Sequence, residues 1–140
     1  MNLNKKGFTL VELLSVIVIL SVIVLIATNA VVPMADSAKK QVLAMEANSL
    51  VKAAQTLYIQ ENSTNSKCYT YDEIIESGLI EKNDASYTGS ISIEVGEDGN
   101  YSYKIWLSNG QYTINGVTPD VTSDDVEASA ENASTTCSAN

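Results

Sequence analysis

The longest apolar pattern in the chain lies near its N-terminus. From Leu13 to Ala35 no residue carries a formal charge. As a helix rising about 1.5 Å per residue, this run spans about 34 Å, enough for the ~30 Å hydrocarbon core of a bilayer. Lys5 and Lys6 precede it, so the positive-inside bias predicts a cytoplasmic N-terminus and an outward-facing remainder. The pattern predicts one membrane-spanning helix.

A second pattern, of helical period, follows the apolar run. Apolar residues recur in steps of four and three, which places them on one face of a helix. They are Leu43, Ala47, Leu50, Ala54 and Leu57, with Val51 and Tyr58 beside them. We therefore expect one helix from about Phe8 to Gln60, apolar all round over 8–34 and amphipathic over 35–60. A sheet is its expected partner, because these small residues would make a weak coiled-coil seam.

Short elements are predicted after residue 60. The polar segment 61–67 ends the long helix. Thr70 and Glu73 have the spacing of a capping box and open a short helix, which Gly78 closes. The residues expected to re-enter the core after it are Leu79 and Ile80.

Alternating apolar and polar residues predict three antiparallel strands, over 91–95, 101–107 and 111–117, joined by turns at 96–100 and 108–110. Their apolar face would cover the stripe of the long helix. The residues expected on that face are Ile91, Ile93, Val95, Tyr101, Tyr103, Ile105, Leu107, Tyr112 and Ile114. The tyrosines could instead form a ligand platform, but core packing is the preferred interpretation. The expected fold class is α+β.

Composition narrows the function classes. The chain has 140 residues, room for one domain beside the membrane segment, and a formal net charge of −9. Such an acidic surface repels nucleic-acid phosphates, so no direct nucleic-acid binding is expected; solubility is the simpler meaning of the charge. The chain has no histidine and no arginine, which excludes Ser-His and Cys-His nucleophiles. The remaining residues form no recognisable catalytic cluster, and neither an enzyme nor a cofactor is expected.

Glu12 is the unusual residue of the N-terminal segment. An acid near the centre of a membrane helix costs about 2.5–3.5 kcal/mol on insertion scales, so a partner or a route to the headgroups is expected. The simpler interpretation is an interfacial residue whose carboxylate reaches the headgroups. The residues around Glu12 favour a different interpretation.

The stretch Gly7-Phe8-Thr9-Leu10-Val11-Glu12, after a lysine-bearing leader and before a long apolar helix, resembles the processing site of type IV prepilins. Type II secretion pseudopilins and competence pilins carry the same class-III signal. The resemblance implies that residues 1–7 are a leader, that a membrane peptidase cuts after Gly7, and that the same enzyme methylates the new amine of Phe8. It also implies a pilin-like fold. The likeness is specific over residues 5–60 and only architectural beyond them.

The motif suggests a role for Glu12 in assembly. Cleavage creates an ammonium at Phe8, beside the positive end of the helix. If Phe8 of an incoming copy meets Glu12 of an assembled one, each charge offsets the other's desolvation. The expected partners are further copies of the chain in a helical polymer, the prepilin peptidase, the pilus assembly platform, and the membrane before assembly.

Two residues are expected to kink the apolar helix. Pro33 lacks a backbone donor, and Asn29 stands where pilin-like chains usually carry their proline. We expect a bend between them, either as the family's melted segment or as a plain proline kink at the membrane surface.

The C-terminal residues 118–140 contain acids, no bases, and many serines, threonines and alanines. A solvated acidic tail is favoured. Calcium is the alternative, because some pseudopilins bind it in their last loop. The candidate ligands are Asp120, Asp124, Asp125 and Glu127.

Cys68 and Cys137 both lie outside the membrane in the expected topology, where disulfides persist. Many pilins carry a bridge near the C-terminus, and the resemblance implies that these two cysteines form one. Free thiols and intermolecular links are the alternatives.

The expected function is that of a structural subunit of a type IV pilus, stored in the bacterial cytoplasmic membrane and then extruded into a surface fibre that serves adhesion or motility. A pseudopilin of a secretion or competence machine shares the same assembly chemistry. The alternative of another class is a membrane-anchored extracellular binding domain, which has no reason to be cut after Gly7.

Overall fold

The computed structural model of the chain describes residues 7–83, 85–117, 120–129, 131, 133 and 137. The chain divides into two compact units, Met1–Ser37 and Ala38–Asn140. The helix α1, Leu10–Gln60, begins in the first unit and ends in the second. The second half of this helix therefore belongs to the same compact unit as the sheet.

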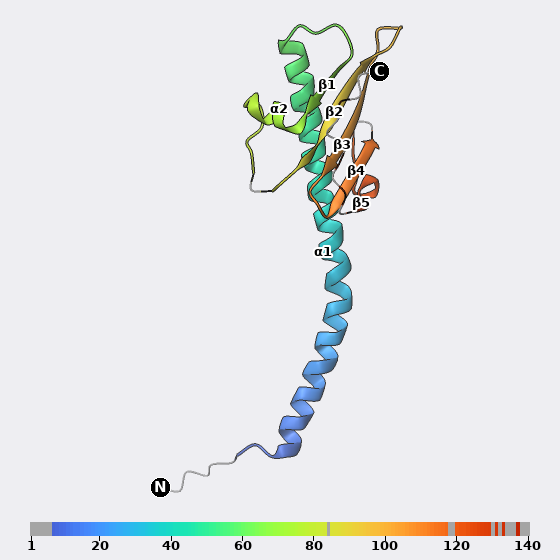
Figure 1. The fold of residues 1–140 in the computed structure, drawn as a ribbon. Coiled ribbons are helices and arrows are strands. Elements are labelled where there is room, and N and C mark those ends of the chain that lie inside the picture. Colours follow the sequence, from blue (N-terminus) through green and yellow to red (C-terminus); the bar gives the residue numbers. More distant parts are fainter. Residues whose placement is uncertain are drawn as a thin grey trace. The chain divides into compact units, whose positions relative to one another are not determined.

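The second unit contains the remaining elements (Figure 1). They are β1 (Lys67–Thr70), α2 (Tyr71–Glu76), β2 (Thr88–Val95), β3 (Tyr101–Ser108), β4 (Tyr112–Val117), the 3-10 turn η1 (Ser123–Asp125) and β5 (Glu127–Ala128). The sheet has the order β1-β2-β3-β4-β5, and all neighbouring strands are antiparallel. The predicted α+β class, with a long N-terminal helix and a small antiparallel sheet, is confirmed.

The predicted stripe of α1 forms one side of the core. Leu43, Ala47, Leu50 and Ala54 are fully buried, and Leu57 packs against the core from its edge. Ile91, Ile93, Ile105, Leu107 and Ile114 of the sheet are buried in the same core cluster. Burial of this apolar surface is the main stabilising contribution to the second unit.

The capping box that was expected to open the short helix is present. Glu73 N donates to Thr70 Oγ1 at 3.3 Å, and Thr70 N donates to a Glu73 carboxylate oxygen at 2.8 Å. Gly78 follows the helix with a φ of 77°, in the left-handed region that only glycine adopts without cost. The helix therefore begins and ends where its sequence signals place it.

The sheet has five strands where the pattern predicts three. The additional strands are short and lie at its two edges: β1 ends in the residue that caps α2, and β5 has only two residues, both exposed. Neither segment alternates apolar and polar residues over a sufficient length to be recognised. Their pairing depends on the neighbouring strands, β2 and β4.

Some residues expected in the core lie outside it. Tyr101 is 51 % exposed although Ile105 and Leu107, on the same side of β3, are buried. Tyr103 is half-buried. Leu79 is exposed, whereas Ile80 packs against the core. The apolar face therefore ends before the first residues of β3, and these tyrosines lie at the rim of the core.

The acidic C-terminal stretch differs from the solvated tail that its composition predicts. Val121 and Val126 are buried in the core. Asn48 of α1 donates from Nδ2 to the Val121 carbonyl at 2.9 Å, and its Oδ1 accepts from the Val121 N–H at 3.0 Å. Ser108 donates to the Glu131 carbonyl at 2.8 Å. A few apolar and polar anchors therefore fix a segment whose charges remain in solvent.

Candidate functional site

The start of α1 is a second capping box. Glu12 N donates to Thr9 Oγ1 at 3.2 Å, and Thr9 N donates to Glu12 Oε2 at 3.2 Å. The first turn closes with Leu13 N donating to the Thr9 carbonyl at 3.2 Å. Two backbone donors that would otherwise lack a partner at the helix start are thereby satisfied. The Glu12 carboxylate thus has a role within its own chain, as part of the cap.

Gly7 and Phe8 precede this cap and are open on all sides within the first unit. No atom lies within 4 Å of the position that a Cβ of Gly7 would occupy, and Phe8 is 91 % exposed. A peptide bond between such residues is accessible to a peptidase. Lys5 and Lys6, the predicted charges of the leader, lie outside the described residues.

The surface that follows the cap is apolar and uncovered. Every residue from Gly7 to Lys39 is exposed, including all large apolar side chains of the first half of α1. By length and composition, α1 could cross a membrane, and it is the one such helix among the described residues. An apolar surface of this extent requires lipid or a protein partner as cover.

Three hydroxyl groups of this surface donate hydrogen bonds within the helix. Ser15 donates to the Val11 carbonyl at 2.8 Å, and Ser21 donates to the Ile17 carbonyl at 2.6 Å. Thr28 donates to the carbonyl four residues before it in the same way. Each hydroxyl therefore enters a hydrocarbon environment with its hydrogen bond already formed.

Asn29 and Pro33 both lie inside α1, which is helical on both sides of them. The proline removes one backbone donor without ending the helix, as the neighbouring turns continue. The bend expected between these two residues stays a prediction. So does the pairing of Phe8 with Glu12, which involves two copies of the chain.

The two cysteines are joined. The Sγ atoms of Cys68 and Cys137 lie 2.02 Å apart, and the bridge connects β1 to the end of the chain. The pairing implied by the family resemblance is therefore present, and free thiols are excluded. The bridge closes a loop that contains most of the second unit, Ala38–Asn140, which we call the head. In the chain-entropy model, closing this loop stabilises the folded chain by about 4 kcal/mol.

The calcium candidates are dispersed. The Asp125 carboxylate accepts from Thr122 N at 2.8 Å and from Thr122 Oγ1 at 2.9 Å, and these hydrogen bonds lower the pKa of Asp125. Asp120 and Asp124 are exposed. Within the residues that the structure describes, no three acidic or cysteine side chains gather as metal ligands would.

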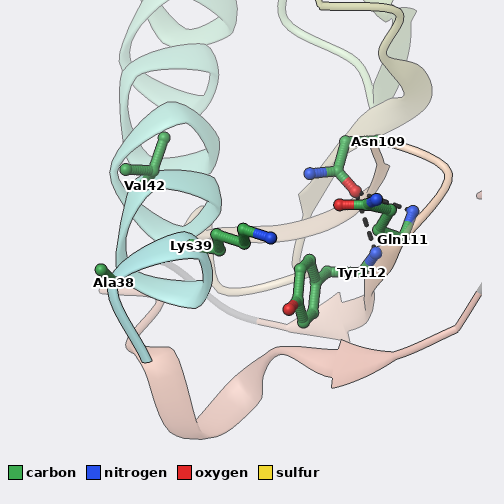
Figure 2. A pocket seen from close by; sticks show the side chains of 6 residues that line it. All are labelled: Ala38, Lys39, Val42, Asn109, Gln111 and Tyr112. Atoms are coloured by element: carbon green, nitrogen blue, oxygen red, sulfur yellow. Dashed lines mark hydrogen bonds between the residues drawn. The ribbon is translucent and has the colours of Figure 1, made fainter. Parts of the chain in front are cut away.

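A hollow of about 300 Å³ lies between α1 and the β3–β4 turn (Figure 2). Lys39 extends from the helix toward Tyr112 on the opposite wall. Asn109 Oδ1 accepts from Gln111 N at 3.0 Å and from Tyr112 N at 2.9 Å. The amide of Asn109 is therefore used to close the turn, which reduces what this hollow offers to a ligand.

Of the residues in this candidate site, the sequence pattern singles out Gly7, Phe8 and Glu12 but not Thr9. The signal for Thr9 is the same Thr-x-x-Glu spacing that predicts the start of α2. This signal is easily missed, because a charged Glu12 in an apolar segment also predicts a partner in another chain.

Comparison with known proteins gives one family match. Residues 2–28 match the prokaryotic N-terminal methylation motif. The match covers Gly7, Phe8, the capping box of Thr9 and Glu12, and more than half of the exposed apolar run. No curated protein and no solved structure matches the chain.

Proposed function

Because this motif is the class-III prepilin signal of type IV pilins and pseudopilins, we propose that the protein is a structural subunit of a type IV pilus. It is cut after Gly7 by a prepilin peptidase, methylated at Phe8 and polymerised through the first half of α1. The observation that carries the proposal is the signal at residues 2–28, followed by an apolar helix surface that is exposed throughout.

In this proposal Glu12 has two tasks, of which the cap is the first. In the unprocessed chain its Oε2 accepts from Thr9 N, and a carboxylate has further lone pairs that can accept another donor. Cleavage creates an ammonium at Phe8, directly before the capping residue. In the polymer each Glu12 caps its own helix and accepts the ammonium of a neighbouring copy.

This pairing sets the register of assembly. A subunit displaced along the bundle would leave an ammonium and a carboxylate unpaired in an apolar environment, which costs several kcal/mol per ion. The capping box supports the pairing because it holds the carboxylate at a fixed place beside the helix start. The exposed apolar surface supplies the remaining driving force, since neighbouring helices replace lipid as its cover.

Two substitutions separate the cap from the charge. Glu12→Gln keeps a side chain that can complete a capping box but removes the negative charge. Thr9→Ala removes the cap hydroxyl and keeps the charge. We expect Glu12→Gln to insert and to be cleaved normally but to give no filaments, and Thr9→Ala to give filaments in reduced number.

The measurement is electron microscopy of surface filaments, with immunoblotting of the membrane fraction to establish that each variant is inserted and processed. Filaments of normal number and length from Glu12→Gln would refute the charge pairing. Loss of filaments from Thr9→Ala alone would show that the cap, and not the ion pair, is what assembly requires.

A pseudopilin of a type II secretion or competence system is the second candidate, because the matched signal is common to both classes. The two functions differ in fibre length. We expect long surface filaments that disappear when the protein is deleted; a short periplasmic or envelope-bound fibre would favour the pseudopilin. Adhesion and motility would be properties of the assembled fibre, and the single chain has a structural role in this proposal.

A further inference from the structure

We propose that the head carries a binding site for a neutral saccharide at the end of α1. A hollow of about 580 Å³ lies there, between the last turns of α1, the turn that follows it and the beginning of β3. This volume falls within the ~300–1,000 Å³ typical of small-ligand sites. The end of α1 and the β2–β3 hairpin lie at the same end of the head (Figure 1).

Two tyrosines that line this hollow, Tyr58 and Tyr101, are in ring contact. Tyr58 is buried, and its hydroxyl donates to the Asn65 carbonyl at 2.9 Å, which fixes the ring. The Tyr101 ring forms a T-shaped pair with it, with centroids 5.8 Å apart and planes at 76°. Tyr101 is nevertheless 51 % exposed. An aromatic ring that is held by a ring contact and is half exposed to solvent suits stacking against the C–H face of a sugar ring.

The rim of the hollow supplies hydrogen-bonding groups in fixed positions. Asn62 follows the last turn of α1 and has the left-handed conformation, with a φ of 51°. Its N–H donates to the Ile59 carbonyl at 3.0 Å, and the next residue, Ser63, donates to the Tyr58 carbonyl at 3.2 Å. These two backbone hydrogen bonds form a Schellman cap. Asn62 and Gln55 both line the hollow and bring side-chain amides to it.

The electrostatics of the hollow select a neutral ligand. None of the described residues that line it carries a formal charge, in a chain whose net charge is −9. The neighbouring Glu61 is already used, as it pairs with Lys67 and accepts from the Tyr69 hydroxyl at 2.8 Å. An anion would be repelled by the chain as a whole, and a cation would find no carboxylate. Amides, hydroxyls and an open aromatic ring remain, and these recognise a polyhydroxylated neutral molecule.

A second copy of the chain is the competing occupant. Ile59, at the rim, is 72 % exposed, and together with Tyr101 it could form a contact between subunits. The chemistry of the hollow favours the saccharide, because an apolar contact between subunits would not use the amide and hydroxyl groups that line it. The experiment therefore measures both ligand binding and self-association.

The test uses the full mature chain in micelles of a detergent without a sugar headgroup, such as C12E8. Saturation-transfer NMR is recorded with maltotriose and triacetylchitotriose, which are neutral, and with trigalacturonate, which is acidic. We expect transfer to at least one neutral trisaccharide and none to trigalacturonate. Sedimentation of the same samples reports the oligomeric state.

Three variants locate the site. Tyr101→Ala should weaken binding about fivefold or more, which is the order of effect expected for one aromatic contact. Tyr101→Phe keeps the ring and should bind as the unchanged chain does. Met45→Ala removes another exposed apolar side chain, away from the hollow, and is the matched control. Trp106 fluorescence shows whether each variant is folded.

Three results would overturn the proposal. One is no transfer to either neutral trisaccharide at about 10 mM, a concentration at which even millimolar binding is detected. The second is equal binding by Tyr101→Ala and the unchanged chain. The third is self-association that Tyr101→Ala abolishes, without saccharide binding, which would assign the surface to a contact between subunits.

Discussion

At the scale of single residues, the head depends on a close approach of two backbones at Gly89. This residue of β2 lies opposite Leu107 of β3, and a Cβ on it would come within 2.0 Å of the Trp106 carbonyl oxygen. A backbone atom in the middle of a sheet cannot move aside as a side-chain tip can. Only glycine fits there without displacing a strand.

Gly89→Ala should therefore lower the free energy of unfolding by about 3 kcal/mol or more, the upper range for forced overpacking. The measurement is urea unfolding in micelles followed by the fluorescence of Trp106, the single tryptophan. The matched control is Gly96→Ala, whose Cβ would come within 2.7 Å of the tip of the Asp98 side chain but no nearer than 3.5 Å to a backbone atom of Asn100. Equal losses from the two variants would contradict the explanation.

A second prediction at this scale concerns pH. Burial raises the pKa of Glu46 in the folded chain, and the nearby Tyr71 and Tyr87 have their own pKa values raised by burial first and by the Glu46 charge second. A carboxyl with a raised pKa binds its proton more tightly in the folded than in the unfolded state. Its contribution to stability is present at low pH and is lost as pH rises through the pKa that Glu46 has in the folded chain.

Glu46→Gln should accordingly be more stable than the unchanged chain at pH 7, and the difference should shrink as pH falls toward 4. Urea midpoints of both proteins at these two pH values give the comparison. A difference that grows toward low pH would mean that the carboxylate is stabilised by the fold.

At the scale of elements, the anchoring of the acidic C-terminal stretch on α1 is the main contact that composition does not reveal. The side-chain amide of Asn48 pairs with both backbone groups of Val121, 73 residues later. This contact positions Val121 in the core and prepares the short pairing of β5 with β4. An acidic, serine-rich segment thereby becomes part of the sheet.

Asn48→Ala should reduce the free energy of unfolding by about 2 kcal/mol, since it leaves two backbone groups without their partner. The control is the adjacent Ser49→Ala, whose hydroxyl donates only within the helix, to the Met45 carbonyl at 3.0 Å. Urea unfolding of both variants is the measurement. A loss of equal size from Ser49→Ala would show that helix propensity, and not the anchor, is responsible.

The elements that can be predicted from the sequence are those specified locally. The stripe of Leu43 to Leu57 has a clear period, and α2 has both of its end signals. The edge strands β1 and β5 have no comparable signal, because their pairing depends on neighbours elsewhere in the chain. The exposure of Tyr101 is of the same kind: alternation places it on the core face, and only the assembled head shows that the core ends before it.

At the scale of the whole molecule, the chain combines a head with its own core and an apolar helix surface that lacks cover. The motif that the family match covers could be recognised in the sequence because its residues are contiguous, from Gly7 to Glu12. The hollow at the end of α1 could not, since residues near 55–64 and 101–103 meet only through the fold. In the proposed function, lipid covers the exposed apolar surface of α1 before assembly, and neighbouring helices cover it afterwards.

The central claim is that the chain is cut between Gly7 and Phe8 before it assembles. The direct measurement is the N-terminal sequence and intact mass of the protein purified from its native membrane. The account predicts a chain that starts at methylated Phe8 and lacks residues 1–7. A chain that still begins with Met1, in cells with an active prepilin peptidase, would contradict it.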